Sequence, residues 1–342
     1  MDIRALILDL ASQEERLTVN HVLKQIGNAY SRAYLLRFFK QLIAEGKLLK
    51  SGSTRGAFYV LPEHAAALAD RFEKRYTNHQ LQEHEILLEV YQKLYFLNQL
   101  PEHLRSIFYY AFSEMLNNAI DHSQSKFLVV RVERKKDTLC FEIEDSGVGV
   151  FNNVMKQRDL SSPLEAIQDL LKGKTTTAPH AHSGEGIFFT SKAADRFTLD
   201  SFSTRLTVDN LIPDIFIHEM SPLKSGTRVI FELRLDHAGH LDELFRQYYT
   251  DPDDFSFDKT FIQIKLYTRG SIYISRSQAK RVLFGLEVFR TIVLDFDKVP
   301  GVGQAFADEI FRVFRLSHPE IQISYINANE AVRFMIERVA KI

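Results

Sequence analysis

The chain has 342 residues, of which 45% are hydrophobic and 25% are charged, and its formal net charge at pH 7 is −1. This composition is typical of a soluble globular protein with two or three domains. No apolar run reaches membrane-spanning length, and Met1-Asp2-Ile3-Arg4 does not begin a signal peptide. The single cysteine, Cys140, excludes an internal disulfide framework, so we expect a cytoplasmic protein with no membrane partner.

The first 62 residues are expected to form a separate unit. Apolar periodicity predicts helices over 1–11 and 22–26, and Ser31 is expected to cap a third helix. A polar tip at 51–56 then separates two short strands. The third helix is expected to turn three apolar pairs inward, namely Tyr34-Leu35, Phe38-Phe39 and Leu42-Ile43.

Three helices followed by a β-hairpin resemble a winged helix, whose third helix enters the major groove of DNA. The charge of residues 1–62 agrees, because nine Lys and Arg stand against five Asp and Glu, a balance of +4. Many winged helices serve protein contacts instead, and that alternative stays open. The residues that the resemblance assigns to DNA are Arg32, Arg37 and Lys40 on the third helix and Lys50 and Arg55 on the hairpin.

Residues 63–98 are expected to be a helical connector, with a helix over 81–95, that couples the first unit to the next and can support a homodimer. Histidine kinases carry a phospho-accepting His on such helices. Here His84-Glu85 is not followed by Arg-x-Pro, and the helical hairpin is too short. We therefore expect His84 to be an ordinary surface residue.

The segment from Glu102 to Ser123 is predicted to be a helix, because apolar residues recur in it at three- and four-residue steps. Glu114 and Asn118 lie four residues apart and so project from one face of this helix. A carboxylate and an amide oxygen on one face can hold Mg²⁺, while waters and phosphate oxygens complete its shell. The carboxylate can also orient or deprotonate an attacking water.

Two later segments carry glycines in a pattern that favours a nucleotide. Alternating strands over 128–132 and 139–143 end in Asp145-Ser146-Gly147-Val148-Gly149. An ionised Asp only accepts hydrogen bonds, which suits the exocyclic amine of adenine, and the glycines let the backbone approach a flat base. Gly184-Glu185-Gly186 then opens a helix over 187–195, where backbone amides can meet phosphate oxygens.

Taken together, residues from about 80 to 235 resemble the GHKL ATP-binding fold of DNA gyrase B, the ATP-driven heat-shock chaperones, histidine kinases and MutL. The Glu-x-x-x-Asn helix and the two glycine segments match three motifs of that family, and Ser225-Gly226-Thr227 before a strand over 228–233 resembles the fourth. The resemblance implies an ATP-binding domain over 99–240, built as an α+β sandwich with a mixed sheet on one side and helices on the other. It further implies Glu114 as general base, Asn118 as Mg²⁺ ligand, Asp145 and Thr227 at the adenine, and Gly147, Gly149, Gly184 and Gly186 as residues that shape the pocket.

By the same resemblance, residues 150–183 would be the lid over ATP. Lys172 or Lys174 can neutralise phosphate charge there, and we count Lys174 among the nucleotide-binding residues; a solvated basic loop is the alternative for each. His180 and His182 have no matching cluster of Cys or His, so we expect no metal at them.

Residues 255–342 are expected to form a third unit, a small α/β domain whose βαβα order implies parallel strands. It resembles the STAS-like domains of anti-anti-sigma factors, which carry a phosphorylatable Ser in a loop between a strand and a helix. The corresponding loop, 297–304, contains no Ser or Thr. We therefore expect a nucleotide sensor or an interaction module rather than a phospho-acceptor.

The fold class expected is thus α/β, a GHKL-type α+β sandwich flanked by a winged helix and a STAS-like domain. The leading hypothesis is a regulator, controlled by ATP and Mg²⁺, that binds DNA through residues 1–62 and a protein partner through its C-terminal domain. The alternative is a serine/threonine protein kinase that resembles the anti-sigma factors and acts on a STAS-type partner. A DNA-remodelling ATPase is a third hypothesis, but neither a transducer segment nor a nuclease motif is visible.

Overall fold

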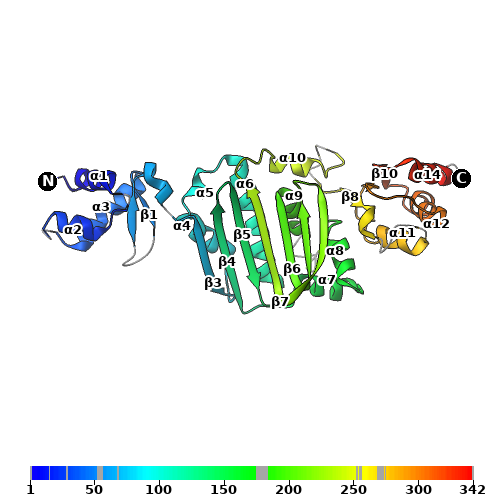
Figure 1. Ribbon diagram of the computed structural model, residues 1–342, viewed down its shortest axis with the longest axis horizontal. Coiled ribbons are helices and arrows are strands. Elements are labelled where there is room, and N and C mark those ends of the chain that lie inside the picture. The colour runs from blue at the N-terminus through cyan, green and yellow to red at the C-terminus, as the bar shows by residue number, and fades with distance from the viewer. Residues whose placement is uncertain are drawn as a thin grey trace.

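The computed structural model describes residues 2–14, 16–27, 30–51, 57–67, 69–174, 184–251, 253, 256–267, 273 and 275–340. Three units follow one another along the long axis of the molecule, with the two termini at opposite ends (Figure 1). Among the described residues, no helix combines the length and the apolar character that crossing a bilayer requires.

The N-terminal unit has three helices and then a two-stranded antiparallel sheet, in the order that the sequence predicts. Its elements are α1 (Ile3–Gln13), α2 (Val19–Gln25), α3 (Arg32–Ala44), β1 (Leu49–Ser51) and β2 (Phe58–Val60). Ser31 caps α3 as expected, because its side chain accepts a hydrogen bond from the Tyr34 amide.

The core of the N-terminal unit uses only part of the apolar face predicted for α3. Leu35, Phe39 and Leu42 are fully buried, as expected. The expectation that Tyr34 points inward is wrong, since this side chain is 39% exposed and stacks on Tyr30 instead. An amphipathic helix buries only one stripe of its surface. Tyr34 lies beside that stripe, where its phenol can keep the hydroxyl group in water.

Between the N-terminal and central units, the expected helical connector is wrong at residues 71–77. This segment is β3 (Arg71–Thr77), which pairs antiparallel with the next strand along its whole length. Phe72 and Tyr76 are buried and lie four residues apart, so they share one face of the strand. Lys74, between them on the same face, is exposed and donates to Glu89 of α4 (Glu83–Lys93). The connector also contains η2 (Pro62–Ala67) and α5 (Phe96–Gln99), and His84 is exposed on α4 as expected.

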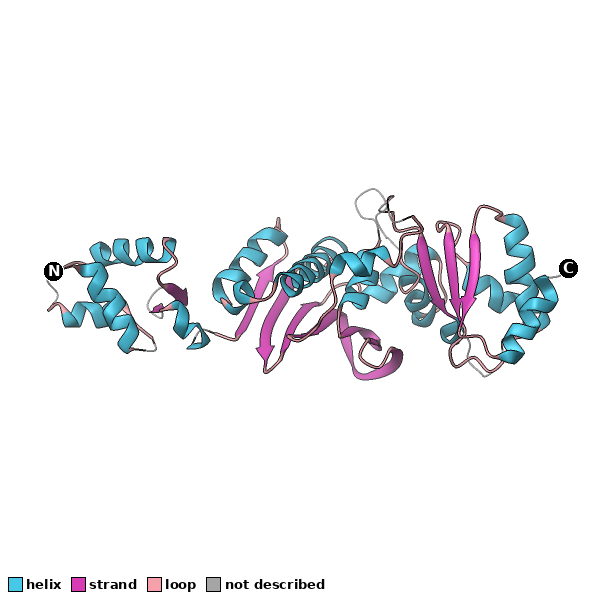
Figure 2. Cartoon of the chain, turned by 90° about the horizontal axis from the view of Figure 1, so that it is seen from above, coloured by secondary structure: helices cyan, strands magenta, loops and turns pink. Residues whose placement is uncertain are grey.

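The central unit is one five-stranded sheet with helices on one face (Figures 1 and 2). The strand order is β3-β4-β5-β7-β6, and every neighbouring pair is antiparallel, so the mixed sheet that we expected is wrong. Its further elements are α6 (Glu102–His122), β4 (Phe127–Lys135), β5 (Thr138–Asp145), α7 (Val150–Arg158), α8 (Pro163–Leu170), α9 (Gly186–Ala193), β6 (Arg196–Asp209), β7 (Asp214–Arg234) and α10 (Leu241–Arg246).

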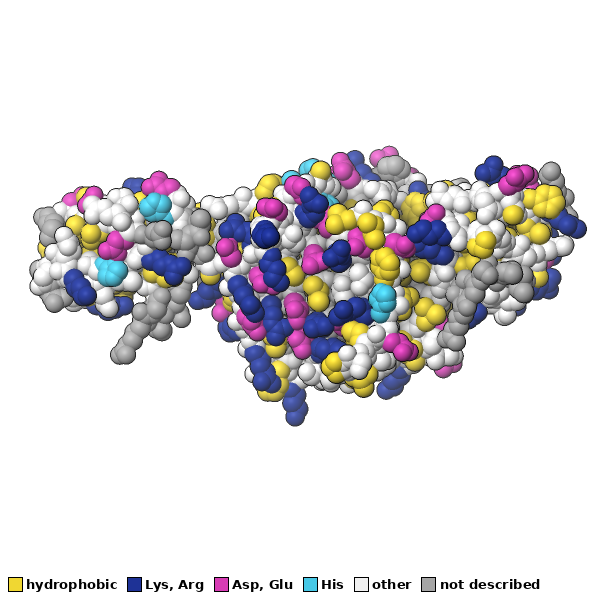
Figure 3. Space-filling view, viewed as in Figure 1, with side chains coloured by type: hydrophobic (Ala, Val, Ile, Leu, Met, Phe, Trp, Pro, Cys, Tyr) yellow, Lys and Arg dark blue, Asp and Glu magenta, His cyan; other side chains and the backbone are white. Residues whose placement is uncertain are grey.

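The two faces of this sheet differ in character. On the helix side, Phe141 stacks on Phe231 at 4.8 Å between ring centroids and meets Phe112 of α6 edge to face. On the other side, Lys and Arg alternate with Asp and Glu (Figure 3), and Arg131 bonds to Glu73 and Glu142 across three strands. An amphipathic antiparallel sheet of this kind presents its apolar face to one helix layer.

The C-terminal unit is a parallel three-stranded sheet, which confirms the parallel strands predicted from the βαβα order. The strand order is β10-β9-β8, and β8 is the strand that lies next to the central unit (Figure 1). Its elements are β8 (Lys259–Gln263), η3 (Ile264–Tyr267), α11 (Arg276–Leu283), β9 (Thr291–Asp295), α12 (Gln304–Asp308), η4 (Glu309–Phe314, a π-helix), α13 (Arg315–Ser317), β10 (Gln322–Ile326) and α14 (Glu330–Ala340).

Candidate functional site

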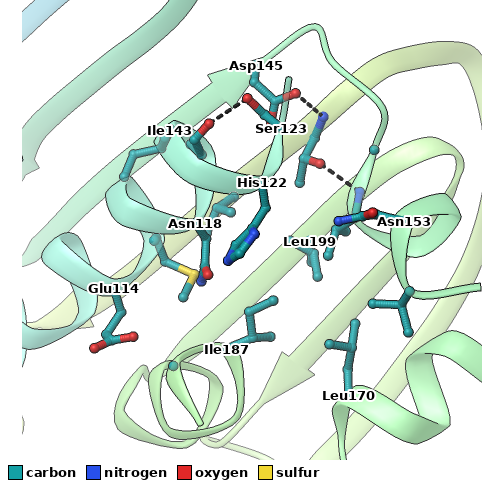
Figure 4. A pocket seen from close by; sticks show the side chains of 18 of the residues that line it. Glu114, Asn118, His122, Ser123, Ile143, Asp145, Asn153, Leu170, Ile187 and Leu199 are labelled. Atoms are coloured by element: carbon teal, nitrogen blue, oxygen red, sulfur yellow. Dashed lines mark hydrogen bonds between the residues drawn. The ribbon is translucent and has the colours of Figure 1, made fainter. Parts of the chain in front are cut away.

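A cavity of about 290 Å³ opens between α6 and the glycine-bearing segments of the central unit, close to the size range of small-molecule pockets. Glu114 and Asn118 both line it, as their four-residue spacing on α6 predicts. Figure 4 shows their side chains along the same helix wall, with Ile187 opposite. The pocket is lined by Glu114, Met115, Asn118, Ala119, His122, Ser123, Ile143, Asp145, Gly149, Val150, Asn153, Val154, Leu170, Gly184, Gly186, Ile187, Leu199, Thr227 and Val229.

Asp145 lies at the end of β5 and is only 4% exposed. Its Oδ1 accepts hydrogen bonds from the backbone amides of Gly147 at 2.7 Å and Thr227 at 3.3 Å. Burial raises the pKa of Asp145, and these two bonds together with the nearby Lys224 ammonium oppose the rise. A carboxylate has acceptor capacity beyond two bonds, so Asp145 can still receive an exocyclic amine from the pocket.

Thr227 connects two walls of the pocket. While its amide donates to Asp145, its Oγ1 accepts a hydrogen bond from the Val150 amide at 2.9 Å, at the start of α7. The fourth motif is therefore joined to the second by direct bonds. Gly226, just before Thr227, has a φ of +74°, which lets β7 approach the Asp145 backbone closely.

Two glycines permit close approaches that a side chain would block. A Cβ on Gly147 would stand 1.8 Å from the Ser123 carbonyl oxygen, so this turn packs directly against the end of α6. A Cβ on Gly186 would stand 2.1 Å from Glu114 Oε2, so the Glu114 carboxylate lies against the first residue of α9. The first and third motifs therefore meet at this point of the pocket, and Gly149 and Gly184 line it nearby.

The expected lid residues divide into two groups. Val150, Asn153 and Val154 of α7 and Leu170 of α8 line the pocket. Lys174 does not: its Nζ lies 5.6 Å from the ring centroid of Phe257 and 5.3 Å from that of Phe289. These aromatic faces attract the ammonium away from the pocket. His180 and His182 fall outside the described residues.

Lys172 also departs from its expected place beside phosphate. It is 3% exposed, and its Nζ donates to the carbonyl oxygens of Arg281 at 3.2 Å and Phe284 at 2.5 Å, at the C-terminal end of α11. Burial lowers the pKa of Lys172 to about 8. The sequence shows the charge of this residue, but only the fold shows that it is buried against another domain.

Polar and apolar residues that were assigned no role from the sequence also line the pocket, among them His122, Asn153 and Leu170. His122 lies four residues after Asn118, so the helical period that relates Glu114 to Asn118 could have found it. Asn153 and Leu170 carry no comparable signal, because their position depends on how α7 and α8 fold over the pocket. Leu170 adds an apolar side chain to the wall of the cavity, and Asn153 adds an amide.

The metal ligands that the pocket offers show whether it can hold Mg²⁺ together with a nucleotide. Glu114 and Asn118 offer a carboxylate and an amide oxygen, the hard ligands that Mg²⁺ takes. Within the described part of the chain, no group of three or more His, Cys, Asp and Glu is placed to hold a metal. So few protein ligands fit a cation that also binds phosphate oxygens, rather than one that the protein coordinates completely.

The N-terminal residues expected to contact DNA lie apart from this pocket. Arg32, Arg37, Lys40 and Lys50 are all exposed on the N-terminal unit, and the Arg32 guanidinium donates to Asn20 Oδ1 at 2.6 Å. Arg55 lies outside the described residues. The first three lie on α3, so they share one element that nucleic acid or a protein can reach.

Comparison with known families agrees with this site. Residues 104–237 match the family described as histidine kinase-, DNA gyrase B-, and HSP90-like ATPase, and residues 278–333 match the STAS-like domain of unknown function (DUF4325). No curated protein matches the chain. The chain therefore contains a GHKL ATPase domain followed by a STAS-like domain, a combination that fits an ATP-binding regulator.

Proposed function

We propose that this protein binds Mg²⁺-ATP in the pocket described above and hydrolyses it slowly. The observation that carries the proposal is the convergence of segments around Glu114, Asp145, Gly186 and Thr227, far apart in sequence, on one cavity. Each supplies a group suited to one part of ATP. Domains of the matched family bind ATP, generally with Mg²⁺, which supports the assignment.

In this proposal Asp145 accepts a hydrogen bond from the adenine amine, and Thr227 keeps that carboxylate oriented through its amide. The N-terminal end of α9, with Gly184 and Gly186, receives phosphate oxygens on backbone amides. Asn118 would hold Mg²⁺, which when bound neutralises charge on the phosphates. Glu114 also orients and deprotonates the attacking water.

We further propose that nucleotide binding controls a regulatory output. The N-terminal unit would bind DNA through Arg32, Arg37, Lys40, Lys50 and Arg55, because its balance of +4 suits a phosphate backbone. The STAS-like domain would contact a protein partner. A homodimer would be compatible with this arrangement, in which α4 buries one face in the central core and exposes Leu88 on the other.

The protein-kinase alternative is favoured by one observation, the presence of a STAS-like domain in the same chain. Two observations argue against the STAS-like domain of this chain as the acceptor of the phosphoryl group. None of the described residues after Val229 lines the pocket, and the loop over 297–304 contains no Ser or Thr. A kinase would therefore act on a separate STAS-type partner.

Calorimetric titration with Mg²⁺-ATP and Mg²⁺-ADP tests the site. We expect micromolar binding in the intact protein and its loss in Asp145→Asn. Incubation with γ-labelled ATP separates the two functions, since free phosphate alone supports the ATPase, whereas label on Ser or Thr of an added STAS protein supports the kinase. Absence of any shift on a genomic DNA pool would exclude the DNA-binding part of the proposal.

A further inference from the structure

Two segments, α9 and the end of α8 with the residues that follow it, both line the nucleotide pocket and contact the C-terminal unit. On α9, Gly186 and Ile187 line the pocket, while the next two residues, Phe188 and Phe189, are 1% and 2% exposed within the hydrophobic core of the C-terminal unit. On α8, Leu170 lines the pocket, and Lys172 follows two residues later inside the C-terminal contact.

The contact made by α9 is aromatic and continuous. Phe188 stacks on Phe257 at 5.1 Å, Phe189 lies 4.8 Å from the same ring, and Phe257 meets Phe289 at 5.4 Å, all measured between ring centroids. Phe289 lies at the end of the loop that leads into β9. A close-packed interior of this kind transmits displacement, because it has no voids to absorb one.

The contact made by the end of α8 is polar and specific. Besides the two bonds from Lys172 Nζ to α11, the Lys172 carbonyl accepts from Thr260 Oγ1 of β8 at 2.8 Å. Gln168 Nε2 donates to the Leu266 carbonyl at 2.5 Å, and the Tyr267 hydroxyl donates to the Gln168 carbonyl at 3.4 Å. Residues 168–172 are thus bonded to three segments of the C-terminal unit.

Among its described residues, the N-terminal unit shows no comparable connection to the pocket. Its hydrophobic core consists of residues between 3 and 61 and shares none of them with the core of the central unit. The chain reaches the central sheet through β3, an edge strand, and no described residue of β3 or β4 lines the pocket. Movement of the pocket walls therefore reaches the core of the C-terminal unit directly. It reaches the N-terminal unit through β3, which is joined to the sheet by β4 and to α6 by the bond from Asn78 to the Ile120 carbonyl.

We infer that the STAS-like domain is the part of this protein that responds to occupancy of the nucleotide pocket, and that Lys172 is a positioning residue that couples the two. The inference rests on the proposed nucleotide binding. A ligand that packs on Leu170 and Ile187 restrains α8 and α9, and this restraint stabilises the docked C-terminal unit. By linkage, loss of the docked state lowers nucleotide affinity by the same factor by which bound nucleotide favours docking.

The forward test is hydrogen exchange on the full chain, without nucleotide and with saturating Mg²⁺-ATP, paired with calorimetry on the same samples. We expect exchange of α11 and β9 amides to slow by roughly 5-fold or more, with α1 to α3 unchanged and no response in Asp145→Asn. If calorimetry shows binding but α11 and β9 do not respond, or if α1 to α3 respond equally, the inference is wrong and the proposed function stands. If no nucleotide binds, both are wrong.

The reciprocal test uses Lys172→Met, which keeps the stem of the side chain and removes the donor. We expect nucleotide affinity to fall roughly 5-fold or more and the exchange response of α11 to disappear, while the response of α6 remains. Thr260→Val, which removes a single bond to the Lys172 carbonyl, provides a milder variant if Lys172→Met does not fold.

The matched control is Lys298→Met. Lys298 also bridges the C-terminal and central units, through an ion pair to Asp214 at 2.8 Å, but Asp214 does not line the pocket. We expect its nucleotide affinity to stay within about 2-fold of the unaltered protein, less than the coupling factor expected at Lys172. Equal losses in Lys172→Met and Lys298→Met would show a general effect of undocking and would overturn the role given to Lys172.

Discussion

Asp145→Asn should abolish most nucleotide affinity, because the fold fixes which way the new amide points. Oδ1 of Asp145 accepts from the amides of Gly147 and Thr227, so an Asn must place its carbonyl oxygen there. Its NH₂ group then faces the adenine amine, donor against donor. The opposite orientation gives adenine an acceptor but turns the NH₂ group toward two backbone donors. The free-energy cost of opposed donors then appears as a loss of folding stability.

The expected magnitude follows from the bond that is lost. A hydrogen bond to a charged group contributes about 1.5 to 3 kcal/mol. Since 1.4 kcal/mol is tenfold in affinity, its loss alone weakens binding by about 10- to 150-fold. The opposed donors move the result toward the upper end of that range. Burial of Asp145 at 4% exposure leaves little solvent to relieve them.

Calorimetric titration with Mg²⁺-ATP measures the effect, with thermal melting to check that the variant folds. Glu144→Gln is the matched control, because Glu144 is the preceding carboxylate on β5, bonds to Arg131 at 3.1 Å and does not line the pocket. We expect the control to bind normally. An Asp145→Asn protein that folds and binds ATP within about 3-fold of the unaltered protein would refute the adenine-reading role, since the lost bond alone predicts tenfold or more.

Four further predictions concern the same molecule. Glu114→Ala should keep nucleotide affinity but lose phosphate release by about 100-fold or more, and normal turnover in a phosphate assay would exclude Glu114 as general base. Gly186→Ala should melt near the unaltered protein yet release phosphate more slowly, because its Cβ, 2.1 Å from Glu114 Oε2, displaces only the end of a flexible side chain; unchanged turnover would contradict this. Removal of residues 1–62 should abolish DNA shifts and leave calorimetric ATP affinity intact, and a retained shift would place DNA binding elsewhere. Since burial raises the pKa of Asp145 and the ionised form is the acceptor, ATP affinity should fall as pH is lowered, beginning above the ordinary carboxyl range; calorimetry that shows no fall down to pH 4 would argue against it.

Part of the candidate pocket could be predicted because several of its residues follow local rules. Glu114 and Asn118 lie on one helical face, and Asp145 comes at the end of an alternating strand, so sequence spacing alone places them. That these segments converge on one pocket was predicted from the family resemblance and not from periodicity. Asn153 and Leu170 could not be predicted, since no local pattern indicates which side of α7 or α8 meets the pocket.

The errors share a physical cause, which is tertiary context that overrides local pattern. In residues 71–77 only Phe72 and Tyr76 are buried, and the exposed charged residues between them made the segment resemble a surface connector. Lys172 and Lys174 lie in a polar run that resembles a solvated loop, yet Lys172 is buried and Lys174 lies over two phenyl rings. A lysine is buried only where carbonyls and rings are provided for it, and those come from residues about 80 to 115 positions later in the chain.

The N-terminal and C-terminal units contact the pocket walls to different extents, so ATP would affect the two units differently. The N-terminal unit has its own closed core and joins the sheet at β3, the edge farthest from β6. The STAS-like domain instead shares α9 and the end of α8 with the pocket, so it cannot keep its present contacts if those walls move. A nucleotide would then act first on what the C-terminal domain presents to a partner. The N-terminal domain would determine where that event takes place, and its affinity for DNA would change little with ATP.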